Sequence, residues 1–476
     1  MSTFSGLTTA LSGLNAARTG LNVVGQNLTN VNTAGYTRQR TDLASIGAPA
    51  NGSLYSAGVK PGEGVAVAGI ARLGDSFLDA RVRTAFSSAG YTNVRANALS
   101  DIQARMKEPG TDAISGQLTT FWGSWQAVSN TPGDPGVTAT LLQGAAALTQ
   151  SIADGYRGLD TQWSQTRSQA DMLAGEVNST AAQVADLNDK IRQSASSGVP
   201  SSALIDQRNT LTARISQLAG GTVRDLPDGG NEILLGGNVL VSGSQVNTVK
   251  VGGPASMSEA NAPGAGPVQL AWTRHPDTAV DLDGGQLAGT LSVLARPNGD
   301  GTGGVIAETA AQYNNLAETL AKQVNDIHAT AYKADSTQGG PFFSYTAGQA
   351  ASTLAVVPTD TADVATSASA TAGNDGSMAD KISQLGTVPG SPDAQWTKTV
   401  LTTGTATRTA LQQDVAAGTA VTGAVTAQQS NASVDIDEEN VNLLAYQHAY
   451  QAAARVMTAM DEALDVLINQ TGRVGR

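Results

Sequence analysis

Apolar residues recur at steps of three and four at both ends of the chain. The N-terminal set comprises Leu7, Leu11, Leu14, Ala17, Leu21, Val24, Leu28 and Val31. The C-terminal set continues without a break through Leu443, Tyr446, Tyr450, Ala453, Met457, Met460, Leu464 and Leu467. This spacing places side chains on one face of a helix, as in coiled coils. We therefore predict a helix at each end, and we expect the two to pair with each other or with the same ends of neighbouring subunits.

The two predicted helices differ in their local signals. Glycines interrupt the first helix at Gly6, Gly13, Gly20 and Gly25. Because an interior glycine costs about 0.5–1 kcal/mol relative to alanine, this helix should be marginal alone and depend on a partner. The second helix begins with Asp435 or Asp437 as a capping residue, and acidic residues follow in its first turn, where the helix dipole favours negative charge.

The pattern changes several times between the two ends. Residues 37–72 are typical of an extended loop or hairpin, and residues 74–219 return to helical periodicity, divided by turn signals into four helices. Residues 220–304 carry short Val, Leu and Ile runs between glycines, which is typical of strands. Helical patterning resumes over 307–334 and 393–430. The predicted fold is mainly α with a β-rich insert.

These changes predict a division into three domains. They are a terminal coiled-coil-like polymerisation domain with an adjoining loop (1–72 with 431–476), a long helical rod-like bundle (73–219 with 305–430), and a small inserted β-rich outer domain (220–304). The length of 476 residues fits this division, because domains average about 150 residues.

Composition excludes several classes of function. The chain has no cysteine, which excludes disulfides and thiol chemistry, and its net charge of -12 with sparse Lys and Arg argues against a nucleic-acid partner. No stretch approaches the roughly 18 apolar residues that span a bilayer, so membrane insertion is not expected. The N-terminus lacks the basic start and apolar core of a cleaved signal peptide.

Candidate catalytic and metal-binding groups each have a simpler structural explanation. The acidic cluster at 435–439 could hold a cation, but helix capping accounts for it. His275 lies near Asp277 without a nucleophile motif, which favours a surface loop. The aromatic group of Phe121, Trp122 and Trp125 has the spacing of a buried helix face. We predict no catalytic, metal or cofactor-binding residue and no enzymatic activity; the alternative is a carboxylate pair assembled from distant residues.

One polar segment follows the N-terminal helix and has a recognisable order: Asn27, Asn30, Asn32-Thr33 and Gly35-Tyr36. Asparagine and threonine side chains compete for backbone hydrogen bonds, and glycine accepts positive φ, so this segment should end the helix and turn the chain. Residues 14–39 resemble the N-terminal signature of the flagellar axial family of rod, hook and hook-associated proteins. Residues 434–452 resemble the closing helix of the same family, although Gly25 and Leu28-Thr29 depart from its usual residues.

Internal marks resemble the hook-associated members of this family. They are Thr37-Arg38-Gln39, Phe121-Trp122 with Trp125-Gln126, residues 130–135, residues 324–328 and Phe342-Phe343. The resemblance implies a structural subunit at the junction of hook and filament, exported by the flagellar type III pathway to the cell exterior. It further implies a tubular homo-oligomer whose ends fold on assembly, with hook protein, a second junction protein on the filament side and an export chaperone at the C-terminal helix as partners. Alternatives left open are a hook or rod protein, a secreted wall hydrolase and an adhesin.

The resemblance also assigns candidate assembly residues. In the N-terminal signature they are Leu7, Leu11, Leu14, Leu21, Val24, Asn27, Leu28, Asn30, Asn32, Thr33, Gly35 and Tyr36. In the C-terminal helix they are Leu443, Tyr446, Tyr450, Ala453, Met457, Met460, Leu464 and Leu467.

Overall fold

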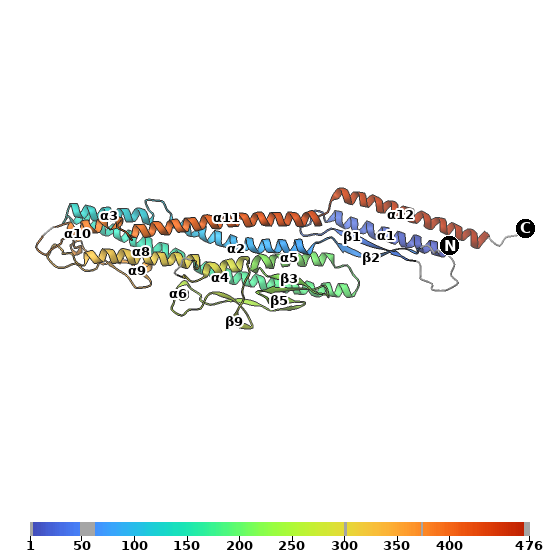
Figure 1. Ribbon diagram of the computed structural model, residues 1–476, viewed down its shortest axis with the longest axis horizontal. Helices are drawn as coiled ribbons and strands as arrows, with labels where there is room; N and C mark the ends of the chain where they lie inside the picture. Colours follow the sequence, from blue (N-terminus) through green and yellow to red (C-terminus); the bar gives the residue numbers. More distant parts are fainter. Residues whose placement is uncertain (1–2, 48–61, 299–301, 373–374, 471–476) are drawn as a thin grey trace, which may run out of the picture.

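The molecule is elongated, and both ends of the chain lie at the same end of it (Figure 1). The computed structural model describes residues 3–47, 62–298, 302–372 and 375–470. Helices α1 (Thr3–Thr29) and α12 (Ile436–Asp465) lie side by side, and α12 continues into a short π-helix, η3 (Val466–Gln470). We call α1 and α12 the terminal pair. The predicted pairing of the two terminal helices is confirmed.

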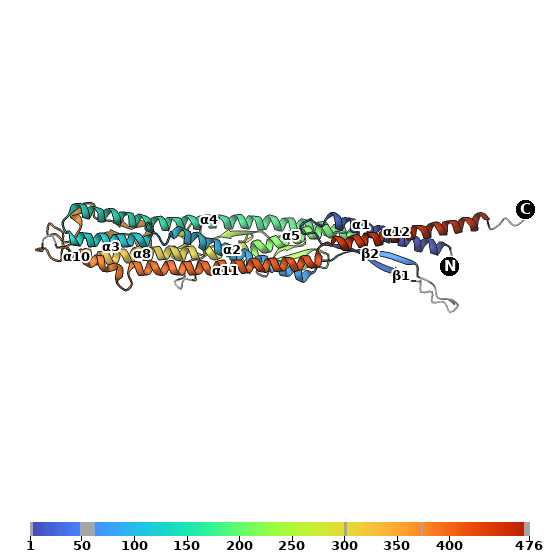
Figure 2. The ribbon, with the colours of Figure 1, turned by 90° about the horizontal axis from the view of Figure 1, so that it is seen from above.

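A bundle of long helices, here called the rod, makes up most of the length (Figure 2). Its helices are α2 (Ser76–Met106), α3 (Ile114–Asn130), α4 (Pro135–Ser196), α5 (Ser202–Ala219), α8 (Val305–His328), α10 (Ser377–Ser383) and α11 (Pro392–Ala432). The four helices predicted over 74–219 are confirmed. Asp134 illustrates the local cause, because its carboxylate accepts the N–H groups of Gly136 and Val137 while Pro135 occupies the first helical position.

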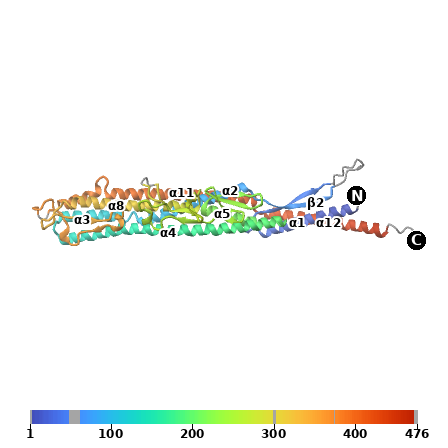
Figure 3. The same ribbon diagram turned by 90° about the horizontal axis from the view of Figure 1, so that it is seen from below.

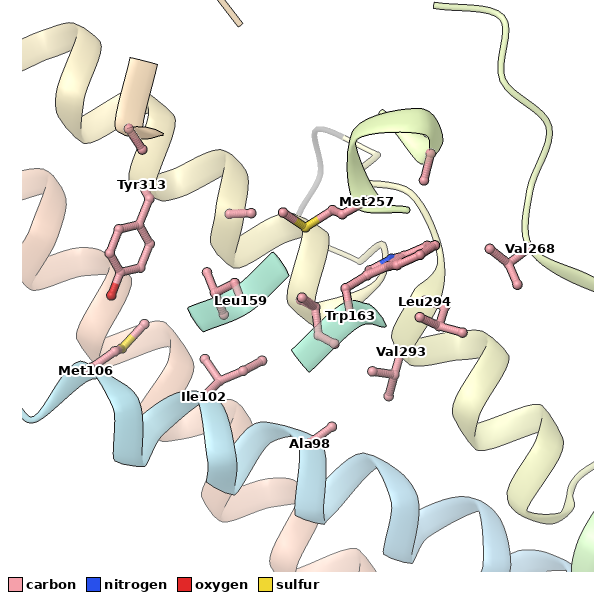
Figure 4. Packing of buried hydrophobic residues seen from close by; sticks show 14 of the residues in the cluster. Ala98, Ile102, Met106, Leu159, Trp163, Met257, Val268, Val293, Leu294 and Tyr313 are labelled. Carbon is pink, nitrogen blue, oxygen red and sulfur yellow. The ribbon is translucent and has the colours of Figure 1, made fainter. Parts of the chain in front are cut away.

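The rod is held by a continuous apolar core. Figure 4 shows one part of it, where Ile102 of α2, Leu159 and Trp163 of α4 and Tyr313 of α8 belong to the same cluster of buried side chains. The aromatic group predicted to be buried is also in this core, since Trp125 is 0% exposed. Burying such side chains stabilises each by roughly 1.5–3 kcal/mol, which makes the rod the stable part of the chain.

A β unit lies along one side of the rod (Figure 1), where its strands contact α4, and in the view from below it overlaps the middle of the rod (Figure 3). One antiparallel sheet has the order β3 (Thr222–Asp225), β4 (Asn231–Leu235), β5 (Asn238–Ser242), β6 (Gln245–Val246). A second has the order β7 (Val249–Gly252), β8 (Gln269–Trp272), β9 (His275–Ala279). The predicted β-rich insert is confirmed, and it also contains two helices, α6 (Met257–Ala260) and α7 (Gly285–Leu294). In α7, Leu287 and Leu294 lie seven residues apart and pack into the rod core as one helix face.

Short elements complete the fold. The predicted hairpin consists of β1 (Gln39–Ile46) and β2 (Gly64–Arg72), which are antiparallel with a bulge at Asp42/Leu43. At the rod end far from the termini lie β10 (Phe343–Ser344), α9 (Ala350–Thr353), β11 (Ala355–Val356), η1 (Thr361–Asp363) and η2 (Gln384–Thr387).

Helix asparagines attach extended segments to the rod. Each one bonds both the C=O and the N–H of a single residue, with donor–acceptor distances of 2.8–2.9 Å. The pairs are Asn178 with Val249, Asn188 with Asn231, and Asn325 with Phe343. A side-chain amide carries one acceptor and one donor group, so it satisfies a peptide as a neighbouring strand would.

His328 joins the loops at the far end of the rod, and it does so with a neutral ring. Its Nδ1–H donates to the carbonyl of Gly340 at 2.7 Å, and its Nε2 accepts the N–H of Ala365 at 3.0 Å. The side chain is 1% exposed, and burial lowers its pKa. A protonated ring could no longer accept the N–H of Ala365, so the neutral form belongs to the folded state.

Acidification should therefore loosen this end of the rod. Because the pKa of folded His328 lies below the ordinary value of about 6.5, its contribution is complete above that pH and is lost as pH falls, by at most about 1.4 kcal/mol per pH unit. We expect the urea midpoint to fall between pH 7.5 and pH 5.5, and His328→Gln to lower stability at pH 7.5 but flatten this pH response. His275→Gln, on an exposed strand, is the control; an unchanged pH response in His328→Gln would show that another group is responsible.

Candidate assembly interface

The contact within the terminal pair is built on glycines spaced by seven residues. The facing residues are Gly6 and Met460, Gly13 and Ala453, and Gly20 and Tyr446, so the two helices run antiparallel. A Cβ at Gly6 would lie 2.7 Å from the Met460 Cε, and one at Gly20 would overlap the ring of Tyr446. Each larger α12 side chain thus sits where α1 has no side chain. The spacing of these glycines was visible in the sequence, but sequence reasoning considered only their cost to the helix.

The leucines predicted as an apolar stripe are not the most buried residues of α1. The fully buried apolar residues are Ala10, Ala16, Ala17, Val23 and Val24. Among the predicted N-terminal residues, Val24 and Asn27 are buried, Leu7, Leu14, Leu21, Leu28, Asn30 and Tyr36 are half-buried, and Leu11, Asn32, Thr33 and Gly35 are exposed. In the closing helix, Leu443, Tyr446, Ala453, Met457, Met460 and Leu464 are half-buried, and Tyr450 and Leu467 are exposed.

Helix α12 leaves most of its surface uncovered. Of its residues only Glu439 is fully buried, while Val441, Leu444 and Val456 are 65%, 56% and 46% exposed. Large apolar side chains at this exposure on one helix are typical of a surface that another molecule covers.

The polar signature after α1 joins the helix to the hairpin. The Asn27 side chain, 1% exposed, donates to the carbonyl of Gln39 at 2.9 Å and accepts its N–H at 3.0 Å. The same Asn27 Oδ1 accepts the Tyr36 hydroxyl at 2.8 Å. Burial, with the carboxylates of Asp206 and Glu439 nearby, raises the pKa of Tyr36 to about 12, so this hydroxyl remains a donor. The signature therefore fixes α1 to β1 through hydrogen bonds of Asn27.

The next two residues, Thr37 and Arg38, bond this segment to the rod and to α12. The Thr37 N–H donates to the Asp206 carboxylate of α5 at 3.1 Å, and the Arg38 N–H donates to the carbonyl of Ala432 at 2.9 Å. The Arg38 guanidinium binds Glu439 at 2.7 Å through Nε and Glu438 at 2.6 Å through Nη2. Sequence reasoning missed Arg38 and Asp206 as a connected set, because their partners are distant in the sequence.

A cleft lies beside this connection. Its volume is 840 Å³, and it is lined by the turn of residues 30–37, by α2 and α5, and by the stretch from the end of α11 to Val434. The charged side chains on its wall are Arg72, Asp79, Asp206 and Arg214.

The acidic cluster at the start of α12 has a structural role. The Asp435 carboxylate caps the helix by accepting the N–H groups of Asp437 and Glu438, while Glu438 and Glu439 bind Arg38. Over the described residues, no group of three or more His, Asp or Glu side chains is arranged to hold a metal ion. Within the same residues, none of the helices has the length and apolar character needed to cross a membrane.

Three family models match the chain. The model for the helical domain of the flagellar hook-associated protein FlgK matches residues 99–343, which is about half of the chain. The N-terminal residues 7–37 match the flagella basal body rod protein model, and residues 428–470 match the model for the C-terminal part of flagellar basal body rod FlgEFG proteins.

Individual relatives agree with these models. Flagellar hook-associated protein 1 of Bacillus subtilis is 29% identical over the full length of both chains. The protein of the same name from Salmonella typhimurium is 29% identical over 67% of this chain, a match that spans 56% of that relative. The solved structure of the flagellar hook junction protein FlgK from Burkholderia pseudomallei has a similar fold, with a TM-score of 0.62 and 15% identity, covering 73% of this chain and 99% of that one.

The facing of Gly13 and Ala453 can be tested by a disulfide. A Cβ at Gly13 would lie 3.8 Å from the Ala453 Cβ, which matches the mean separation of about 3.8 Å in disulfides. The chain has no native cysteine. We expect Gly13→Cys with Ala453→Cys to cross-link on mild oxidation, detected by mobility on a non-reducing gel.

Two controls make this test specific. Asn15→Cys with Ala453→Cys should not cross-link, since Asn15 is exposed two positions further along α1. Adding Gly20→Ala should slow the Gly13–Ala453 cross-link by crowding Tyr446, whereas Gly25→Ala, with nothing within 4 Å, should not. Equal cross-linking rates in the two background variants would contradict the glycine-seated packing.

Proposed function

The chain belongs to the family of the flagellar hook-associated protein FlgK, and from this membership we propose that it forms the junction between hook and filament. It is a structural component of the flagellum and assembles with other flagellar components. In this proposal it binds hook protein on one side and a second junction protein on the filament side. It has no enzymatic activity.

The observation that carries the proposal is the uncovered apolar surface of α12. We propose that the exposed side chains of α12 and the half-buried leucines of α1 pack against the same helices of neighbouring copies in a tube. The proposed domains are the terminal one (1–72 with 431–476), the helical one (73–219 with 305–430) and the β-rich outer one (220–304). The candidate assembly residues are those given above for the two ends of the chain.

Export and folding are linked in this proposal. The chain leaves the cytoplasm by the flagellar type III pathway with its ends unfolded, and an export chaperone covers the C-terminal helix before export. The terminal pair then folds as it meets neighbouring subunits outside the cell. The thin apolar contact supports this, because glycines replace large side chains along α1 and most of α12 buries little surface.

Gene deletion with complementation tests the junction role. Cells lacking the gene should form hooks, fail to attach filaments and release flagellin into the medium; absent hooks would indicate a rod or hook protein instead. Complementation by Val441→Asp with Leu444→Asp should leave the protein exported but filaments unattached, because charge is placed on the exposed face of α12. Met172→Asp, equally exposed on α4, is the control and should restore filaments. Full restoration by the α12 variant would contradict the proposed interface.

Hydrogen exchange of the purified chain tests the folding and chaperone proposals together. We expect amides of α1 and α12 to exchange rapidly in the free monomer while α4 and α11 remain protected, because only the rod has a large core. Adding a flagellar export chaperone from the same bacterium should slow exchange in α12 alone. Cooperative protection of both terminal helices in the free monomer would refute folding on assembly, and unchanged exchange of α12 with chaperone would refute its proposed binding site.

A further inference from the structure

The terminal pair and the rod are separate packing units. In the described chain, the clusters of buried apolar residues all lie within residues 94–410, in the rod and the β unit. The two parts are joined by residues 30–38, by the end of β2 with Leu73 to Asp75, and by the α11–α12 link, which contains no buried large apolar side chain. The orientation of the terminal pair is therefore set by polar bonds across this join.

One rod carboxylate holds both strands of the hairpin. Asp206 of α5 accepts the N–H of Thr37 through Oδ2 at 3.1 Å and the Nε–H of Arg72 through Oδ1 at 2.6 Å. Thr37 lies two residues before β1, and Arg72 is the last residue of β2. The Asp206 side chain is 8% exposed and that of Arg72 is 18% exposed, so water screens this ion pair only in part.

Asp206 lies among several other polar and charged groups at the join between the terminal pair and the rod. Arg72 also lies 3.9 Å from Asp79 of α2, whose carboxylate accepts the side-chain amides of Asn209 and Gln428 and so joins the ends of three rod helices. The carboxylates of Asp206 and Glu439 both lie near Tyr36 and raise its pKa, after burial as the main cause. Breaking the contacts of Asp206 would release Thr37 and leave Arg72 with only the longer contact to Asp79, while the Asp79 group keeps the rod end intact.

We propose that Asp206 is a latch that holds the terminal pair in one orientation relative to the rod. When Arg72 and Thr37 leave the carboxylate, the pair turns about residues 30–38 and 431–435, and the 840 Å³ cleft beside them changes width. Its use in assembly rests on the proposed junction role. With the latch closed or open, the terminal pair of the same chain would take two orientations, one for neighbours on the hook side and one for neighbours on the filament side.

Pulsed EPR distances on the full-length monomer test the latch. Nitroxide labels are placed by Thr419→Cys on α11 and Gln451→Cys on α12, both exposed and roughly 48 Å apart by the 1.5 Å rise per helical residue. In the molecules whose terminal pair is folded, the chain with Asp206 should give one narrow distance peak above the broad background from unfolded ends. Asp206→Asn loses either the Arg72 or the Thr37 bond, so we expect a second, shifted peak. Arg72→Gln should give the same change, and the two substitutions together should add nothing further, as for residues acting through one contact.

A matched control and an independent check of the fold complete the design. Asp186→Asn removes an exposed pair with Lys190 on α4 and should leave the single peak unchanged. The near-ultraviolet circular dichroism of Trp125, Trp163 and Trp396 reports the rod core, and it should be unaffected in each variant. If Asp206→Asn lost that signal, Arg72→Gln, which lies outside the rod helices, would carry the test.

A single unshifted peak in both Asp206→Asn and Arg72→Gln would overturn the latch. Because the distances are measured on the isolated chain, that result would leave the junction role unaffected, and failure of filament attachment in cells would leave the latch unaffected.

Discussion

Three consecutive residues make the bonds on which the relation between the two halves of the molecule depends. Tyr36 bonds to α1, Thr37 to the rod helix α5, and Arg38 to the last carbonyl of α11 and the first turn of α12. Four helices thus converge on a segment shorter than one helical turn. Buried polar bonds of this kind are specific in direction, whereas apolar contacts are not, so a short polar segment can define an orientation that an apolar surface of the same size would leave variable.

Sequence periodicity was sufficient for the long elements and insufficient for the joins. The terminal helices and the four rod helices over 74–219 were predictable because a stripe of apolar residues is a local signal. The partners of Asn27 and Arg38 were not, because a hydrogen bond to Gln39 or Glu439 depends on tertiary structure that no local pattern encodes. Asparagine was predicted to end a helix only in the segment after α1, and Asn30 does so. Asn178, Asn188 and Asn325 each lie inside a helix and bond to an extended segment, a role that no local pattern indicates.

Composition and packing explain each other in this chain. It has 53 glycines and only 4% aromatic residues, and several of its rings are seated over glycines. Tyr446 covers Gly20, Tyr313 covers Gly155, and Trp122 covers Gly386. A ring facing a glycine brings two backbones close without a cavity, so few large side chains fill a long, thin molecule. The same rule operates in the rod core and in the terminal pair.

A helix pair built on a seven-residue repeat can also be placed one repeat out of register with glycines of α1 still facing α12. Continued past Gly20 and Tyr446, the same steps reach Asn27 and Glu439, which are both buried and polar. Sliding α12 one repeat toward the rod would pull Glu439 away from Arg38, and sliding it the other way would set its carboxylate against Gly20. The polar residues Asn27 and Glu439 therefore prevent the two helices from sliding past each other. Resistance of the pair to force along its axis comes from these residues rather than from the apolar repeat.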